Sequence, residues 1–257
     1  MITFNFLTPV WMIFGLFSID NFLDLFFVFF YNEKYTKLNR EKQSLLRSCV
    51  ICFFYSITVL FNVFLYLNLN YNITYEKKLL SEVNRPTKFF GNICLSYSIY
   101  DLIRIFIYNN KVVNKDFLPI FIHHLFVSFM WYAGHSGQLL YYGYIEFLTE
   151  ISTIFLCMLQ FCQTMISRKS KLLTFSGVGL WITFGFMRIP VTLYVFFNVI
   201  YDVNLAFKNN YNFIQNWYVF YVQLFGMTFL NIVNFYWYSK ITRGFIKLIY
   251  LKNDSAK

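Results

Sequence analysis

Two adjacent histidines, His123 and His124, lie in the middle of an apolar run of the sequence, and the next apolar run carries Glu146 and Glu150. Ionisable side chains are costly at membrane depth, so by default they mark a functional site. An imidazole can act as a general base or a nucleophile, and a neighbouring group can hold it in the required tautomer. We therefore predict His123, His124 and Glu150 as catalytic residues and Glu146 as a supporting one.

The elements that must position these groups are membrane helices. Of the 257 residues, 58% are hydrophobic and only 13% are charged, whereas a soluble domain carries about 25% charged residues. Apolar runs of about 20 residues, the length of a membrane-spanning helix, recur along the chain. We predict an all-α, polytopic membrane bundle of about seven transmembrane helices. The predicted spans are residues 8–30, 47–69, 89–108, 117–134, 139–165, 172–202 and 213–238.

The formal net charge of +10 raises the question of a nucleic-acid partner. The basic residues, however, lie mainly in short connections between apolar runs, which is the pattern of membrane topology. We therefore expect no nucleic acid. Most of the basic residues fall in the odd-numbered connections and the carboxyl-terminal tail, so the amino terminus should be lumenal and the carboxyl terminus cytosolic. The first run lacks a cleavage site and should remain as a span.

Two other predicted spans carry polar residues that should face the bundle interior. Tyr97, Asp101 and Arg104 recur on one face of the third span. Asp101 and Arg104 either pair with each other or position a lipid headgroup. Arg188 lies in the sixth span just before Pro190, whose ring should disrupt the helix. Arg104 and Arg188 are the two arginines that could pair with the glutamates.

Polar residues on the first and last spans have a simpler, structural interpretation. Asp20 and Asp24 share one face of the first span and should turn toward neighbouring helices or the membrane interface. The last span presents Gln223, Asn231 and Asn234 at helical spacing. That face is suited to hydrogen bonds between helices.

The two histidines should point in different directions. His124 shares a helical stripe with Ser128, Trp131 and His135, while His123 points about 100° away. One ring can therefore face a cavity while the other reaches a neighbouring helix. Burial disfavours a charged imidazole, so we expect a neutral ring that can act as base or nucleophile.

A metal centre is not expected, because the histidines and glutamates lack the spacing of known metal motifs. We also expect no resident cofactor. The five cysteines lie in or beside apolar runs and should behave as small hydrophobic residues.

Several of these residues together resemble a known family. The relevant elements are Leu95-Ser96-Tyr97-Ser98-Ile99-Tyr100-Asp101-Leu102, the double histidine, Glu150-Ile151-Ser152-Thr153 and Arg188, in that order. They resemble the TLC domain, which is shared by translocation-associated membrane proteins, ceramide synthases and the ceroid-lipofuscinosis protein family. The chain looks most similar to the small TLC-domain proteins of lipid homeostasis. We divide it into a first helix with its cytosolic loop (1–41), the TLC domain (42–248) and a short cytosolic tail (249–257).

The resemblance implies a location in the endoplasmic reticulum membrane and the handling of sphingolipid, phospholipid or acyl-CoA. In ceramide synthases the paired histidines are implicated in transferring a fatty acyl group to a sphingoid amine. Their second signature also has a histidine-aspartate dyad ahead of two carboxylates. If Glu146 and Glu150 match those carboxylates, the dyad falls on Tyr142 and Gly143. This departure argues against an ordinary ceramide synthase.

Two functions remain open from the sequence. In the first, the protein is a lipid acyltransferase in which His124 acts as base or accepts the acyl group, Glu150 or His123 holds its tautomer, and acyl-CoA is the co-substrate. In the second, the same residues belong to a non-catalytic protein that binds, senses or moves lipids. Membrane lipids are the expected partners in both cases, with a homo-oligomer as an open alternative. A seven-span receptor is a third class, which no motif supports.

Overall fold

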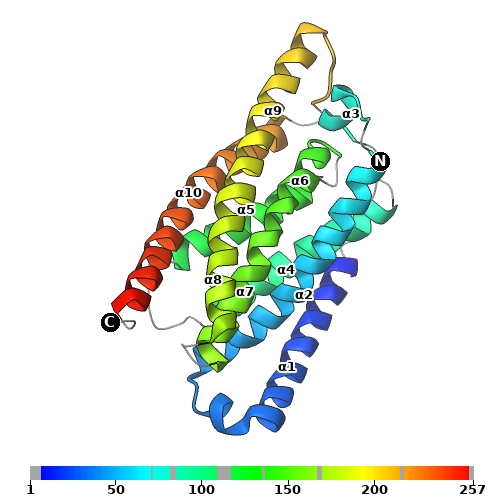
Figure 1. The fold of residues 1–257 in the computed structure, drawn as a ribbon. Helices are drawn as coiled ribbons and strands as arrows, with labels where there is room; N and C mark the ends of the chain where they lie inside the picture. The colour runs from blue at the N-terminus through cyan, green and yellow to red at the C-terminus, as the bar shows by residue number, and fades with distance from the viewer. Residues whose placement is uncertain are drawn as a thin grey trace.

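In a computed structural model the chain folds as an elongated bundle of long helices (Figure 1). The structure describes residues 7–70, 72–81, 85–108, 117–134, 137–166, 170–214 and 217–254. The elements are α1 (Leu7–Thr36), α2 (Arg40–Leu69), α3 (Tyr75–Leu79), α4 (Arg85–Tyr108), α5 (Phe117–Gly134), α6 (Leu140–Glu146), η1 (Phe147–Thr149), α7 (Glu150–Met165), α8 (Lys171–Thr183), η2 (Phe184–Arg188), α9 (Ile189–Lys208) and α10 (Trp217–Asp254). Each predicted span corresponds to one helix or to consecutive helical segments, which confirms the predicted fold class.

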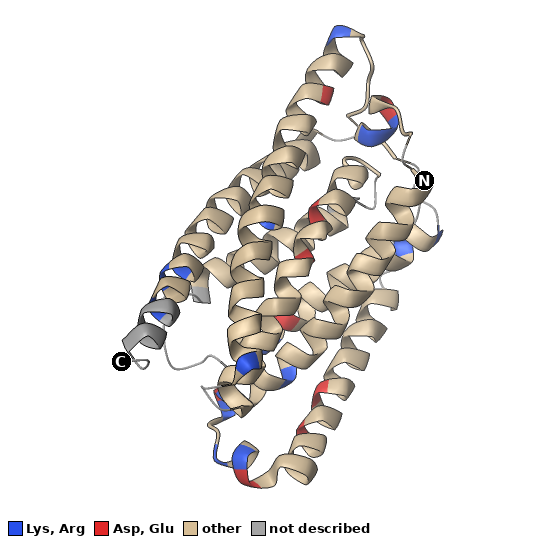
Figure 2. Ribbon diagram, viewed as in Figure 1, with Lys and Arg blue, Asp and Glu red and all other residues tan. Residues whose placement is uncertain are grey.

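The bundle has the lengths and surface of a multi-pass membrane protein. Within the described residues, six helical segments are long and apolar enough to cross a membrane, and Leu118–Tyr132 of α5 forms a shorter apolar helix. Large apolar side chains cover the outer faces, such as Trp11 and Phe29, which are 71% and 79% exposed. A surface of this kind is stable only in contact with lipid. Lys and Arg lie mainly toward the ends of the helices (Figure 2).

Two of the spans are interrupted near their centres. The fifth predicted span consists of α6, a short 3-10 turn (η1) and α7, and the sixth consists of α8, a π-helical turn (η2) and α9. Pro190 lies in the first turn of α9, where its missing N–H is tolerated. The irregular backbone expected at Pro190 therefore takes the form of a π turn directly before it. Such turns occur frequently at functional sites.

Near one end of the bundle, two short stretches pair through their backbones, residues 79–81 and residues 137–139, which we together call the end plug. The Leu139 N–H donates to the Leu79 carbonyl at 2.8 Å, and the Ser81 N–H donates to the Gly137 carbonyl at 2.9 Å. Gly137 has a φ of 81°, a conformation that glycine adopts at little cost. Leu79 itself is completely buried. The plug ties the connection after α2 to the connection after α5.

Candidate functional site

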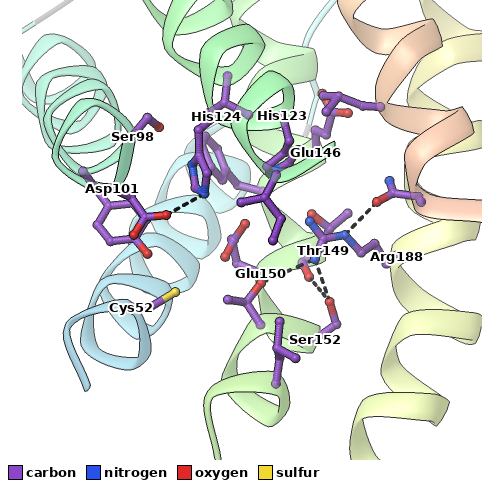
Figure 3. A pocket seen from close by; sticks show the side chains of 18 of the residues that line it. Cys52, Ser98, Asp101, His123, His124, Glu146, Thr149, Glu150, Ser152 and Arg188 are labelled. Atoms are coloured by element: carbon purple, nitrogen blue, oxygen red, sulfur yellow. Dashed lines mark hydrogen bonds and ion pairs between the residues drawn. The ribbon is translucent and has the colours of Figure 1, made fainter. Parts of the chain in front are cut away.

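The polar residues of the bundle converge on one cavity of 460 Å³ (Figure 3). Its walls come from α2, α4, α5, residues 138–139, the α6–η1–α7 segment, the α8–η2–α9 segment and α10. The volume falls within the range of small-molecule sites, about 300–1,000 Å³. All the residues selected from the sequence line this cavity: Tyr97, Asp101, Arg104, His123, His124, Glu146, Glu150 and Arg188.

The centre of the site is a histidine-aspartate pair. The Nε2 atom of His124 lies 2.9 Å from Oδ2 of Asp101, and the aspartate is only 5% exposed. When the ring is neutral and Nε2 donates to the carboxylate, Nδ1 presents a lone pair. The expectation that Glu150 or His123 orients His124 is therefore wrong. The orienting group is Asp101, because the packing of α4 against α5 brings these two residues together.

Asp101 is held by two further side chains. Its Oδ1 atom accepts hydrogen bonds from Nε of Arg104 at 2.8 Å and from the hydroxyl of Ser48 at 3.2 Å. Nη1 of Arg104 also donates to Ser44 at 3.3 Å. The predicted pairing of Asp101 with Arg104 is thus present, and Arg104 is not a partner of the glutamates. These contacts fix the carboxylate and balance its charge.

His123 lines the cavity together with His124. The sequence had suggested that only one of the two rings would face a cavity. The ring of His123 packs edge-on against Trp237 of α10, with 5.4 Å between centroids, and thereby reaches a neighbouring helix as expected. Its Nδ1 atom is buried and has no hydrogen-bond partner among the described residues. Of the stripe predicted with His124, Trp131 lines the cavity, and His135 lies outside the described residues.

The two glutamates do not stack on one continuous α-helix. Glu146 ends α6 and Glu150 begins α7, with the 3-10 turn between them. Both nevertheless line the cavity. Oε2 of Glu150 accepts a hydrogen bond from the hydroxyl of Ser56 at 3.1 Å. Arg188 lies close enough to interact electrostatically with both carboxylates, so it is the arginine that faces them.

Arg188 projects from the π turn into the bundle, where it is 7% exposed. Its Nε atom donates to Oδ1 of Asn234 on α10 at 3.1 Å. Its Nη1 atom donates to the hydroxyls of Ser152 and Thr153 on α7, at 3.1 and 3.4 Å. The arginine therefore joins three segments at the side of the cavity opposite the His124–Asp101 pair (Figure 3).

α2 also contributes to the cavity wall, although no residue of the predicted span 47–69 was selected from the sequence. Ser48, Cys52 and Tyr55 all line the cavity. The ring of Tyr55 stacks on that of Tyr97, with centroids 3.9 Å apart and an interplanar angle of 16°. These three residues follow each other at helical spacing, a pattern that could have revealed the polar face of α2.

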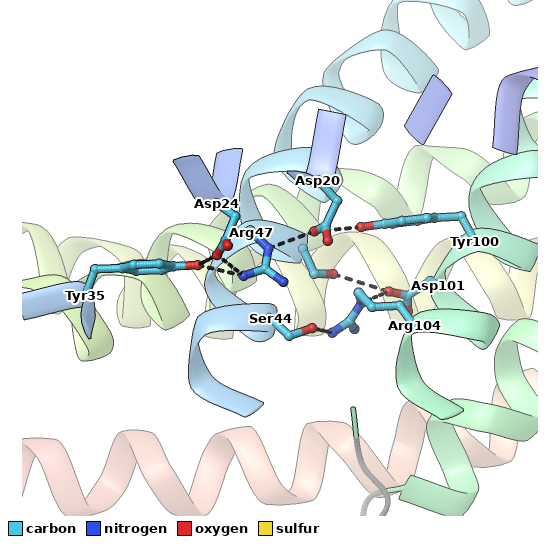
Figure 4. Close-up of polar contacts among 9 residues, drawn as sticks. Asp20, Asp24, Tyr35, Ser44, Arg47, Tyr100, Asp101 and Arg104 are labelled. Carbon is cyan, nitrogen blue, oxygen red and sulfur yellow. Dashed lines mark hydrogen bonds and ion pairs between the residues drawn. The ribbon is translucent and has the colours of Figure 1, made fainter. Parts of the chain in front are cut away.

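A second polar network holds α1 against the same part of the bundle (Figure 4). Nε of Arg47 lies 3.1 Å from Asp20, and its Nη1 lies 2.6 Å from Asp24. The hydroxyl of Tyr35 contacts Asp24 and Arg47, and that of Tyr100 donates to Asp20 at 3.1 Å. The aspartates thus face neighbouring helices, as expected. Arg47, at the edge of the predicted span 47–69, is buried within α2, because α2 begins earlier, at Arg40.

Within the described residues, no group of three or more His, Cys, Asp and Glu side chains is arranged to hold a metal ion. The reactive groups that the cavity wall offers include the imidazoles, carboxylates and guanidinium groups described above. Cys49, Cys52 and Cys157 belong to the same wall as free thiols.

A bundle of membrane helices that encloses an ionisable, partly apolar cavity defines a polytopic membrane protein with an internal site. The profile of the TLC domain matches residues 45–243, which is most of the chain. The protein therefore belongs to the TLC-domain family, and the resemblance noted in the sequence is confirmed. The match begins within α2 and leaves α1 outside. A search of curated proteins gave no significant match.

Proposed function

We propose that this TLC-domain protein binds a membrane lipid in the cavity and transfers an acyl group to an amine or hydroxyl of that lipid. The observation that supports this proposal is the 2.9 Å contact between His124 and Asp101 at the wall of the cavity. An imidazole oriented by a buried carboxylate is a common arrangement for general base catalysis. Apolar residues around the pair suit the hydrocarbon part of a lipid.

In this proposal, Nδ1 of His124 accepts the proton of the acceptor amine or hydroxyl as that group attacks the carbonyl carbon of an acyl-CoA thioester. The carbon–sulfur bond then breaks, and the imidazolium returns the proton to the departing thiolate. Asp101 stabilises the imidazolium, and Arg104 holds Asp101 in place through the 2.8 Å contact to its Oδ1 atom. Glu146, Glu150 and Arg188 bind the polar part of the lipid.

A non-catalytic role in lipid binding, sensing or transport is the second candidate, and one observation favours it. Tyr142 occupies the position where the dyad histidine of ceramide synthases would fall. Its side chain is buried, and its hydroxyl is hydrogen-bonded to Asp202 on α9. Tyr142 therefore stabilises the packing of α6 on α9 and supplies no second base.

Comparison of lipids in cells separates these two functions. Cells that lack the protein are complemented with wild type, His124→Ala or Leu125→Ala at matched abundance. Leu125 is 51% exposed and serves as the control on the same helix. Loss of one acyl-lipid class with His124→Ala alone supports acyl transfer. Unchanged lipids with a folded His124→Ala protein would remove the enzymatic proposal and leave lipid binding.

We further propose that the protein resides in the endoplasmic reticulum membrane, with its amino terminus in the lumen and its carboxyl terminus in the cytosol. The location follows from the resemblance to other TLC-domain proteins. The orientation is supported by the basic residues near the α1–α2 connection and on the last turns of α10, including Lys37, Arg40, Arg243 and Lys247.

A further inference from the structure

A second hollow opens on the outer surface of the bundle, between α2, α7 and α8. It is an apolar groove of 230 Å³, lined by Cys49, Val50, Phe53, Phe54, Cys157, Met158, Phe161, Cys162 and Leu172. Phe54 and Leu172 at its rim are 63% and 41% exposed. These helices belong to segments that are long and apolar enough to span the membrane. The groove therefore opens toward lipid, and the occupant that fits its chemistry is an acyl chain.

Only one layer of side chains separates this groove from the central cavity. Cys49 and Cys157 line both hollows, whereas Cys52 lines the cavity alone and Cys162 lines the groove alone. The thiol of Cys49 donates to Oε1 of Gln160 on α7 at 2.9 Å. Cys49 and Cys157 are each only 4% exposed, so the wall is closed in this structure. A thiol is small and apolar, so little volume must move for the wall to open.

The end of the cavity nearest the end plug offers no alternative entrance among the described residues. Its lining residues Gln138, Leu139 and Leu140 are 0%, 2% and 5% exposed, and backbone hydrogen bonds pair this segment with residues 79–81. The opposite end, near Lys240, carries a charged side chain. An acyl chain that entered at this end would first have to leave the hydrocarbon core of the membrane. The free-energy cost of that step grows with every methylene group. Passage through the side of the bundle avoids this cost.

We propose that the α2–α7–α8 groove is the outer part of a passage by which an acyl chain of a bilayer lipid reaches the central cavity, with Cys49 and Cys157 as its gate. This inference rests on the lipid-binding part of the proposed function and is independent of catalysis. In this arrangement the groove holds the acyl chain of the lipid, and the polar centre of the cavity holds its headgroup or reacting group.

The experiment uses the full chain reconstituted in phosphatidylcholine vesicles in which one acyl chain carries a photoactivatable diazirine. After irradiation, mass spectrometry maps the modified residues. The wild-type protein should be modified at Met158 and Phe161 in the groove and at Val127 and Leu156 in the cavity. A diazirine inserts into any side chain, so the result does not depend on thiol reactivity.

Variants at the gate should change cavity labelling in opposite directions. Cys157→Phe should reduce modification at Val127 and Leu156 severalfold while groove labelling persists, and Cys157→Ala should increase it. Leu125→Phe adds similar bulk on an exposed face of α5 and should leave both patterns unchanged. Cys157→Ala removes only a sulfur atom, so it decides the question even where the phenylalanine variant does not fold.

Two outcomes would overturn the proposal. One is wild-type labelling confined to the groove, and the other is cavity labelling that does not respond to either variant of Cys157. Cavity labelling that responds to the gate in a protein without acyl-transfer activity would retain the passage and reject the catalytic function. The experiments can therefore reject the proposed passage and the proposed acyl transfer independently of each other.

Discussion

His124 on α5 and Asp101 on α4 lie with Nε2 and Oδ2 2.9 Å apart, which makes them one functional unit rather than two separate polar residues. The other carboxylate oxygen of Asp101 is held by Arg104 at 2.8 Å and by Ser48 at 3.2 Å. The imidazole therefore depends on one aspartate that is itself fixed by α2 and α4. This dependence leads to the first prediction.

Removing either member of the pair should abolish most of the proposed acyl transfer. His124→Ala and Asp101→Asn should each lower the rate about 100-fold or more, the usual contribution of a positioned base. The double variant should be no slower than the slower single variant, because the residues act together. Rates of purified protein with a labelled acyl donor provide the measurement. Ser98→Ala is the control, since Ser98 lines the cavity and its hydroxyl donates to the Cys94 carbonyl of its own helix. Losses that multiply would show that the residues act separately.

Removing Arg47 should destabilise the attachment of α1. Arg47→Ala leaves the buried Asp20 without its ion pair, and breaking such a pair costs about 3–5 kcal/mol. Arg47→Lys keeps the charge but loses the forked geometry, so its effect should be smaller. Unfolding in detergent measures both variants against Arg243→Ala, which changes an exposed residue and should alter stability by less than about 0.5 kcal/mol. Equal stability of Arg47→Ala and wild type would contradict a structural role of this network.

Gly179 is required by close packing between α7 and α8. A Cβ atom there would overlap the ring of Phe155, at a separation too short for two carbon atoms. Gly179→Ala should therefore cost about 1–3 kcal/mol, as overpacking does elsewhere. Gly15→Ala is the matched control, because a Cβ on Gly15 meets no atom within 4 Å. It should stabilise α1 by about 0.5–1 kcal/mol. Thermal unfolding of the two variants should shift in opposite directions, and a shared direction would refute this explanation.

The proposed orientation is tested by glycosylation. A tag with an Asn-x-Ser/Thr acceptor added before Met1 should be glycosylated, because it reaches the lumen, while the same tag added after Lys257 should remain unmodified. A mobility shift removed by endoglycosidase is the measurement. Each tagged protein serves as the control for the other. Modification of the carboxyl-terminal tag would reverse the topology.

The sequence predicts the membrane-spanning elements and the inward-facing residues well, for a clear physical reason. A helix that crosses lipid must be long and apolar, and its charged residues must avoid the lipid. Tyr97, Asp101 and Arg104 could therefore be assigned to an interior face from their helical spacing alone. The same rule placed His123, Glu146 and Arg188 at one site from three different spans, all of which line the cavity.

The partners within the site could not be predicted, because they depend on the rotation and depth of each helix relative to its neighbours. His124 meets Asp101 rather than Glu150, and Glu150 meets Ser56. The break between α6 and α7 has no proline or glycine at residues 147–149, so no local signal marked it. Arg47 lies at the edge of the predicted span 47–69, and no local pattern indicates that its partners are the two aspartates of the preceding span.

The bridge between Leu80 and Gln138 in the end plug has a consequence for the assembly of the protein. The chain between these residues contains the whole of α4 and α5. The bridge can therefore form only after both helices have entered the membrane. Residues 137–139, which follow α5, then lie on the same side of the membrane as α3. Formation of the plug therefore cannot precede the insertion of α5, and a nascent chain that ends before residue 137 would lack the hydrogen-bond partners of Leu79 and Ser81.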